Sequence, residues 1–168
     1  MSLFRLSYCG ALATAVMAMS VLATSPALAI VHDSPAAVDT DDKGVAMQGY
    51  DPVAYFTDGA PKAGSSQFQT KLNGATYYFA SAENLKKFTA NPDTYIPQFG
   101  GFCAMGTAHG IKLEGDPHLW HVVNNKLYLN VNAAVDAKWK QDIASNILTA
   151  DSKWPLVKDK TPDQLQPQ

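Results

Sequence analysis

The fold is decided by the stretch QFQTKLNGATYYF, residues 67–79. Two β-prone runs, 67–72 and 75–79, flank the dipeptide Asn73-Gly74. Both residues of such a pair tolerate the positive φ that a two-residue hairpin turn requires. The stretch therefore predicts an antiparallel β-hairpin.

Signals of the same kind continue on both sides of this hairpin. Asp51 precedes a proline and can cap the start of a helix, and Ser81 can cap a helix that runs to about Ala90. A second hairpin is predicted from residues 119–123 and 126–130, which flank two asparagines. The chain thus alternates hairpins with short helices.

The last third of the chain carries the clearest helical pattern. Val135, Trp139, Ile143 and Ile147 recur at every fourth position and predict one apolar stripe on a helix that Pro155 ends. Together these segments predict an α+β fold, in which a small antiparallel sheet built from two hairpins packs with short helices and a C-terminal amphipathic helix. We find no internal repeat in the sequence.

The N-terminus predicts export. Residues 1–29 have the features of a secretory signal peptide: Arg5 near the start, an apolar core over residues 10–23, and a small-x-small site that ends at Ala29. Cleavage there would place the protein in the periplasm or outside the cell. We expect no membrane span in the chain that remains.

The remaining chain is expected to hold one domain. We predict a flexible leader over residues 30–44, a folded domain over 45–157 and a flexible tail over 158–168. The whole chain has 13 basic and 15 acidic residues and a formal charge of -2, so we expect no nucleic-acid partner. Removal of Cys9 with the signal peptide leaves Cys103 alone, so no internal disulfide is expected.

Several short motifs together resemble a known family. They are GYDPVAYF (49–56), YYFAS (77–81), NPDTY (91–95), GGFCA (100–104), the Asp-Pro pair at 116–117 with Trp120, and KLYLN (126–130). Their order and spacing resemble the exported, single-domain YHS-domain proteins over residues 45–155, and residues 45–157 are accordingly expected to be a YHS-like domain.

The resemblance also implies a possible chemistry. The wider YHS group is similar to small metal-binding modules, whose cysteines stand at positions that Ala54, Ala80 and Asn84 occupy here. That thiolate site is therefore not carried over. The GGFCA block is shared with the exported branch, some of whose members are selenoproteins, which implies that Cys103 has value as a metal ligand or in redox chemistry.

Cys103 is the most informative single residue. The two glycines before it allow a sharp turn, and its thiolate would be a soft ligand suited to Cu(I). Met105 and His109 could join it if the chain turns there. Each also has an ordinary interpretation: a buried hydrophobe for Cys103, core filling for Met105 and a helix-end cap for His109. We predict an exported metal-binding domain, with copper as the first candidate and these three residues as ligands.

Two alternatives remain open. Cys103 could serve a thiol redox protein with an external partner protein, or the domain could have a non-catalytic structural or interaction role. Hydrolase and phosphate-loop motifs are missing from the sequence, so no enzymatic activity is assigned. His118 and His121 are three residues apart and are expected on opposite faces of a strand, so they should not share a ligand.

Overall fold

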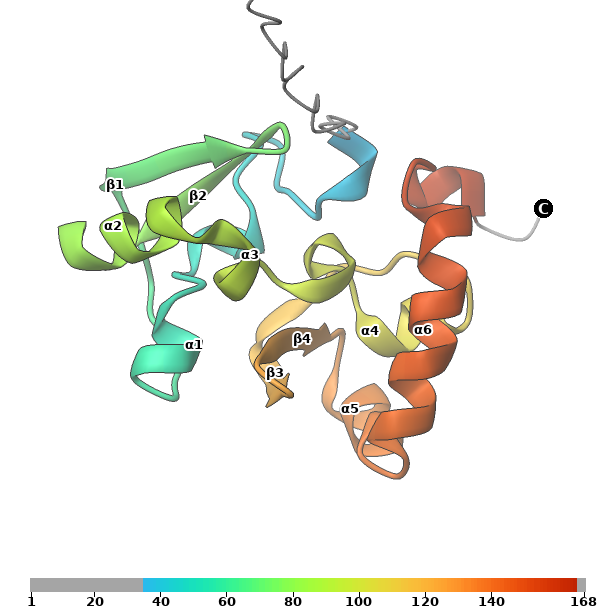
Figure 1. Cartoon of the computed structure of the whole chain (residues 1–168). Coiled ribbons are helices and arrows are strands. Elements are labelled where there is room, and N and C mark those ends of the chain that lie inside the picture. The colour runs from blue at the N-terminus through green and yellow to red at the C-terminus, as the bar shows by residue number, and fades with distance from the viewer. Residues whose placement is uncertain (1–34, 166–168) are drawn as a thin grey trace, which may run out of the picture. The chain divides into compact units, whose positions relative to one another are not determined.

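The computed structural model describes residues 35–165, which belong to one compact unit (Figure 1). The predicted signal peptide and residues 30–34 lie outside this range. The elements in chain order are η1 (Pro35–Ala37), η2 (Met47–Gly49), α1 (Ala54–Thr57), β1 (Ser65–Leu72), β2 (Ala75–Phe79), α2 (Ala82–Ala90), α3 (Pro92–Tyr95), η3 (Gln98–Gly101), α4 (Ala104–Ala108), β3 (Asp116–Val123), β4 (Lys126–Asn130), α5 (Ala133–Trp139), α6 (Ile143–Val157) and η4 (Pro162–Leu165). The predicted α+β fold is confirmed. Within the described range, no helix is both long and apolar enough to cross a membrane.

Both predicted hairpins are present, and each forms its own two-stranded antiparallel sheet, β1–β2 and β3–β4. The turn residues adopt the conformation that their types favour. Asn73 has a φ of 53°, and Asn124 and Asn125 have φ values of 51° and 58°. The predicted cap at Ser81 is in place, because Ser81 accepts the amide of Asn84 at the start of α2. The predicted cap at Asp51 is wrong: Val53 is the N-cap of α1 and has no side-chain cap, and the Asp51 carboxylate accepts the amide of Val53 instead.

The single C-terminal helix that we predicted is wrong in detail, because the apolar stripe runs over two helices. The break falls between α5 and α6, where the Asp142 side chain accepts the amide of Ser145 and caps a new helix. The four-residue spacing survives because both helices face the same core. Pro155 does not end the helix either. It lies inside the last turn of α6, where it removes the hydrogen bond of one main-chain amide, and the helix ends two residues later at Val157.

The two hairpins belong to two copies of one structural unit. Asp116 follows Ser65 by 51 residues, and the other strand ends and the starts of α2 and α5 keep the same offset. The strand register is interrupted at equivalent places, between Ser65 and Gln69 and between Asp116 and Trp120. We name residues 45–90 the first repeat and residues 97–139 the second repeat.

The equivalence extends to contacts outside the hairpins. A parallel bridge joins Val45 to Thr76 in the first repeat, and the equivalent bridge joins Pro97 to Leu127 in the second. Each repeat also opens with three successive residues of positive φ, over 47–49 and 99–101. The structure therefore contains a repeat that the sequence does not show. The repeat is held in the backbone geometry, while few side chains are identical at equivalent positions.

Aromatic packing repeats as well. In the first repeat Tyr77 packs on Phe88 with ring centroids 5.2 Å apart, and in the second repeat Tyr128 packs on Trp139 at 5.8 Å. The two pairs stand at equivalent positions, one on the second strand and one on the helix that follows. Each hairpin therefore buries its inner face against its own helix through one aromatic pair.

The packed part of the chain begins before the predicted boundary at residue 45. Val38 is buried in the core, and the amide of Asp39 donates to the carbonyl of Gly100. A side chain at residue 100 would meet the Ala37 carbonyl oxygen at 1.9 Å, so this glycine is required by the approach of the leader. Figure 1 shows the blue η1 segment between the β1–β2 hairpin and the C-terminal end of α6.

A buried lysine ties both ends of the described chain to the second repeat. Lys112 is 1% exposed, and its ammonium group donates to the carbonyl oxygens of Ala36 at 2.5 Å, Lys158 at 2.6 Å and Lys160 at 2.6 Å. Three donors meet three acceptors, so the charge is buried with its hydrogen bonds satisfied. The packed chain therefore also extends beyond residue 157.

Candidate functional site

Cys103 stands at the start of α4, directly after the left-handed residues of the second repeat. Its side chain is fully buried, and its sulfur accepts the amide of Gly106 at 3.3 Å, as a capping group would. The two glycines before it do adopt positive φ, as the sequence suggested. The resulting turn directs the sulfur into the protein rather than toward solvent.

A chain of hydrogen bonds leads from this thiol toward the surface. The thiol donates to Oδ1 of Asn130 at 3.7 Å, and Nδ2 of Asn130 donates to Oδ1 of Asp136 at 3.1 Å. Asp136 also contacts Nε2 of His121 at 2.6 Å and Nζ of Lys140 at 2.9 Å. We call these five residues the Cys103 network. It joins β3, β4, α4 and α5 around one buried carboxylate.

The electrostatics of the network keep the thiol protonated. Burial raises the pKa of Cys103 above its ordinary value, and the negative charge of Asp136 adds to this rise. The backbone amides of Gly106, Val131 and Met105 oppose the rise, because they would stabilise a thiolate. Burial also acts on the pKa of Asp136, but the hydrogen bonds from Lys140, His121 and Asn130 outweigh it and hold that pKa below its usual range.

The other two predicted ligands lie differently with respect to the thiol. Met105 is in the first turn of α4, and its amide donates to Oδ1 of Asn130 at 3.4 Å. His109 is exposed at the opposite end of α4, where it forms the C-cap before Gly110, whose φ is 78°. Six residues of helix correspond to about 9 Å of rise. The structure therefore brings the Met105 amide to the network, while the Met105 side chain packs against an apolar cluster that contains Tyr128 and Trp139. It does not bring the His109 imidazole beside the thiol.

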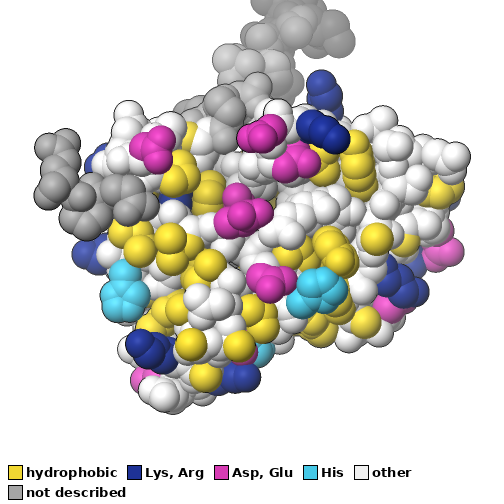
Figure 2. Space-filling view, turned by 180° about the vertical axis from the view of Figure 1, so that it is seen from behind, with side chains coloured by type: hydrophobic (Ala, Val, Ile, Leu, Met, Phe, Trp, Pro, Cys, Tyr) yellow, Lys and Arg dark blue, Asp and Glu magenta, His cyan; other side chains and the backbone are white. Residues whose placement is uncertain are grey.

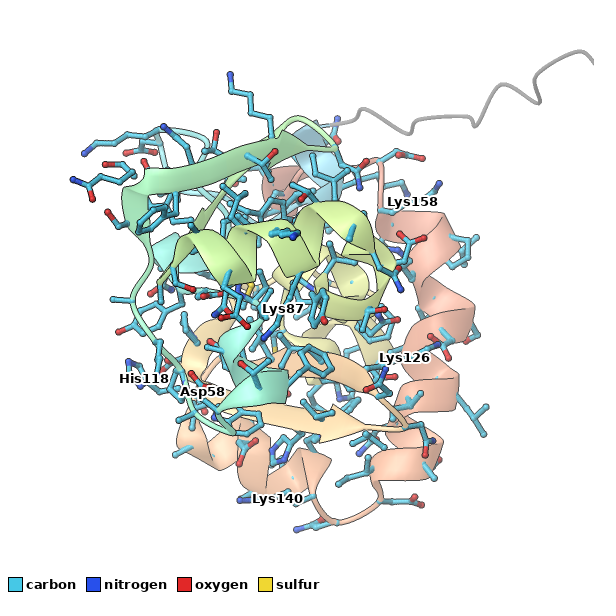
Figure 3. All side chains as sticks on the ribbon, turned by 60° about the vertical axis from the view of Figure 1, so that its left-hand side comes forward. Asp58, Lys87, His118, Lys126, Lys140 and Lys158 are labelled. Carbon is cyan, nitrogen blue, oxygen red and sulfur yellow. The ribbon has the colours of Figure 1, made fainter. Side chains whose placement is uncertain are left out.

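The other two histidines of the described residues have separate partners, as their spacing predicted. His118 is exposed, and its Nε2 lies 2.9 Å from the hydroxyl of Tyr50. His121 belongs to the Cys103 network. Figure 3 shows His118 and Lys140 projecting from different parts of the molecule. On the face in Figure 2, acidic and basic side chains are interspersed, with several acidic ones in the upper and central part.

The donor set limits which metal could fit. Within residues 35–165, no group of three or more histidine, cysteine, aspartate or glutamate side chains is arranged to hold a metal ion. A zinc-type site, which takes four ligands, therefore does not fit these residues. One buried thiol with a methionine two residues on fits only a soft ion of low coordination number. Coordination by Cys103, Met105 and His109 stays a prediction.

We call the position of Cys103 the head of the second repeat. In the first repeat the equivalent position is occupied by Asp51, an equivalence that the sequence did not reveal. Asp51 precedes Cys103 by 52 residues, and its amide donates to the Lys62 carbonyl as the Cys103 amide donates to that of Leu113. The Asp51 carboxylate accepts the amide of Ala80 at 2.8 Å. Its counterpart in the second repeat is the amide of Val131, which faces the sulfur of Cys103.

Sequence reasoning identified Asp51 only as a helix cap, and it missed Asn130 and Asp136 as members of a site. Asn130 ended one of the quoted motifs, which was the available signal. No sequence signal distinguished Asp136, because it lies in a helix among other charged residues. Its burial depends on partners that come from other elements.

These features define the class of protein: a small α+β protein of two hairpin–helix repeats, with a hydrogen-bonded carboxylate at the head of the first and a buried thiol at the head of the second. The YHS domain model matches residues 53–99, which supports a YHS-domain protein. No curated protein and no solved structure gives a significant match. The YHS family is associated with metal binding, which agrees with the metal-binding prediction in its general form. Cys103 lies just outside the matched residues.

Proposed function

We propose that the protein is an exported metal-binding domain, periplasmic or secreted, that takes a soft metal ion at Cys103, with copper(I) as the first candidate. The observation that carries the proposal is the equivalence of Cys103 and Asp51 in the two repeats. The same backbone arrangement presents a carboxylate in one repeat and the single thiol of the described chain in the other.

The head of the first repeat is where the resemblance puts the metal ligands of the wider YHS group. Ala54, Ala80 and Asn84, which replace the cysteines of that group, all contact Asp51: the amides of Ala54 and Ala80 donate to its carbonyl and carboxylate, and Nδ2 of Asn84 donates to its carboxylate at 2.7 Å. In this chain, these hydrogen bonds to Asp51 fill the position that the ligands of the wider group would occupy. The thiol stands at the equivalent place one repeat later.

The surroundings of the sulfur suit a thiolate ligand once its proton is displaced. Three backbone amides face the sulfur and stabilise negative charge there. The pKa of the thiol is raised, so metal binding must release a proton, and affinity should increase with pH. Met105 would be a second ligand once its side chain leaves the apolar cluster against which it packs. His109 would join only after a rearrangement of α4.

Competition with a Cu(I) chelator under reducing conditions tests the proposal. The chain from residue 30 is titrated, beside Cys103→Ser, Met105→Leu, His109→Gln and the matched control Met47→Leu, a buried methionine of the first repeat. We expect Cys103→Ser to abolish competition and Met47→Leu to leave it unchanged. Below the thiol pKa, the wild-type affinity should rise about tenfold per pH unit. An affinity unaffected by Cys103→Ser contradicts the proposal.

The thiol redox alternative gains no support from the geometry. A reactive cysteine has a lowered pKa and is accessible, whereas Cys103 is fully buried and its pKa is raised. We expect native Cys103 to react slowly with iodoacetamide and to react fast only after denaturation. Fast alkylation of the native protein would favour the redox alternative over the metal site.

A further inference from the structure

A cavity of about 240 Å³ lies away from the Cys103 network. It is open to solvent on one side and is bordered by η1, the β1–β2 turn, η3 and the C-terminal end of α6. None of the five network residues lines it. Figure 3 shows Lys158, which lines the cavity, at the opposite end of the molecule from Lys140 of the network. The cavity is therefore a second candidate site, independent of the thiol.

One polar group in its wall is available to a ligand. Tyr77 lines the cavity and is 2% exposed, and its hydroxyl makes no hydrogen bond to any of the described residues. Among the described residues, only Nε1 of Trp139 is a buried polar side-chain atom without a partner, so the Tyr77 hydroxyl meets solvent in the cavity, and a bound acceptor would take the place of that water. Burial raises the pKa of Tyr77 above its ordinary value, so the hydroxyl keeps its proton at neutral pH and can donate it.

The other lining groups indicate the sign and shape of a ligand. Lys158 is the one charged residue among those that line the cavity, and no acidic residue does. The amide side chains of Asn73 and Gln98 are also present, and both can donate hydrogen bonds. Phe99 and Trp154 supply aromatic surface, with ring centroids 5.9 Å apart. Donors and a cation favour an anion, and the rings favour a flat apolar body.

We propose that this cavity binds a small organic carboxylate with a planar apolar body, about one ring in size. Its carboxylate accepts the hydroxyl proton of Tyr77 and pairs with the ammonium group of Lys158. Its ring lies against Phe99 and Trp154. The proposal adds a ligand site to the YHS domain and does not depend on metal binding at Cys103.

The repeat supplies a matched control. Tyr128 occupies in the second repeat the position of Tyr77 in the first, packs on the equivalent aromatic partner and is also 2% exposed. It does not line the cavity. A change from Tyr to Phe at the two positions therefore removes the same group from the same backbone setting, and only one of the two changes should affect binding.

Titration of the chain from residue 30 with sodium benzoate, followed by amide and indole NMR shifts, tests the site. We expect saturable shifts at Gly100 and Trp154, with a Kd of about 10 mM or tighter. Benzyl alcohol, which lacks the charge, and acetate, which lacks the ring, should each bind at least about tenfold more weakly. Tyr77→Phe and Lys158→Gln should each weaken benzoate about tenfold, while Tyr128→Phe and Cys103→Ser should match wild type.

The spectra also report whether each variant is folded, so a loss of binding can be separated from a loss of structure. The absence of saturable shifts in the wild type would overturn the proposal. Equal binding of benzoate and benzyl alcohol would overturn it too, as would equal effects of Tyr77→Phe and Tyr128→Phe. Because Cys103→Ser is expected to keep benzoate binding and lose Cu(I), failure of either site leaves the other testable.

Discussion

The two repeats have the same backbone plan and differ most at their heads. In the first repeat the carboxylate of Asp51 is held by neutral donors: the amides of Val53 and Ala80 and the side-chain amide of Asn84. In the second repeat the equivalent residue is a thiol, and its partner Asn130 leads on to a carboxylate that two titratable side chains contact. Only the second arrangement reaches the surface.

This difference separates a structural role from a chemical one. A buried carboxylate whose acceptors are all met by fixed amides has little to exchange with solvent, and its loss leaves several donors unpaired. The head of the second repeat tolerates a change in charge better, because the partly exposed His121 and the exposed Lys140 lie at its outer end. We therefore expect substitutions to act mainly on stability in the first repeat and mainly on chemistry in the second.

The most direct test of this comparison is to replace the side chain at the head of each repeat, Asp51 and Cys103, with alanine. Asp51→Ala leaves the amides of Val53, Ala80 and Asn84 without an acceptor and should lower the free energy of unfolding by about 4 kcal/mol. Cys103→Ala loses one weak cap and should cost about 1 kcal/mol. Urea denaturation measures the loss of free energy of unfolding in both variants. Equal losses would show that the two heads contribute equally to stability, contrary to the comparison.

A second test concerns a residue that only the second repeat has. Lys112 stands at the position of Pro61 in the first repeat, and it donates to three carbonyl groups at both ends of the described chain. Lys112→Met keeps the apolar stem and removes the donors, so it should lower the free energy of unfolding by about 3 kcal/mol. The exposed Lys153→Met is the control. A loss no larger than that of the control would mean that the three hydrogen bonds add nothing.

The hairpins could be predicted because their information is local. Asn73-Gly74 and the pair Asn124-Asn125 specify positive φ at the turns, and the apolar residues next to them specify the strands. Ser81 specified the start of α2 in the same way. The repeat could not be predicted, because it is encoded in bridges and φ angles while equivalent residues differ, as Asp51 and Cys103 do.

Only part of the site could be predicted, again because the sequence specifies local features and not contacts between distant segments. Cys103 could be identified from its motif, but its burial and its contact with Asn130 depend on strand pairing across more than twenty residues. The glycine motif before it was interpreted as a device for presenting the sulfur. In the structure Gly100 makes room for the Ala37 carbonyl, a contact that no local pattern specifies.

A smaller effect should appear in the pH dependence of the second repeat. The folded pKa of Asp136 lies below its unfolded value, so its contribution to stability is present above about pH 4 and is lost as pH falls through the folded pKa. Asp136→Asn should therefore lower the free energy of unfolding by about 1 to 2 kcal/mol at pH 7 and by progressively less as pH falls below 4. Glu83→Gln, which removes an exposed ion pair of α2, is the control and should show little change at either pH.

The smallest expected effect has the opposite sign. The amide of Gly115 donates to the carboxylate of Asp39, whereas the equivalent amide of Gly64 donates to the carbonyl of Gly49. Burial raises the pKa of Asp39 to about 7; the hydrogen bond from Gly115 opposes this rise, and the charge of Glu114 adds to it. The native state therefore holds a proton that the unfolded chain releases near pH 4, and stability falls as pH rises from 4 to 7.

Asp39→Asn keeps an acceptor for Gly115 and removes this titration. The variant should match wild type near pH 4.5 and exceed its free energy of unfolding by about 1 kcal/mol at pH 8, after allowance for the partial exposure of the carboxylate. The exposed Asp93→Asn of α3 serves as the control. Equal stability of Asp39→Asn and wild type at pH 8 would mean that Gly115 holds its charged partner as easily as Gly64 holds a neutral carbonyl, and the two repeats would then be alike at this position.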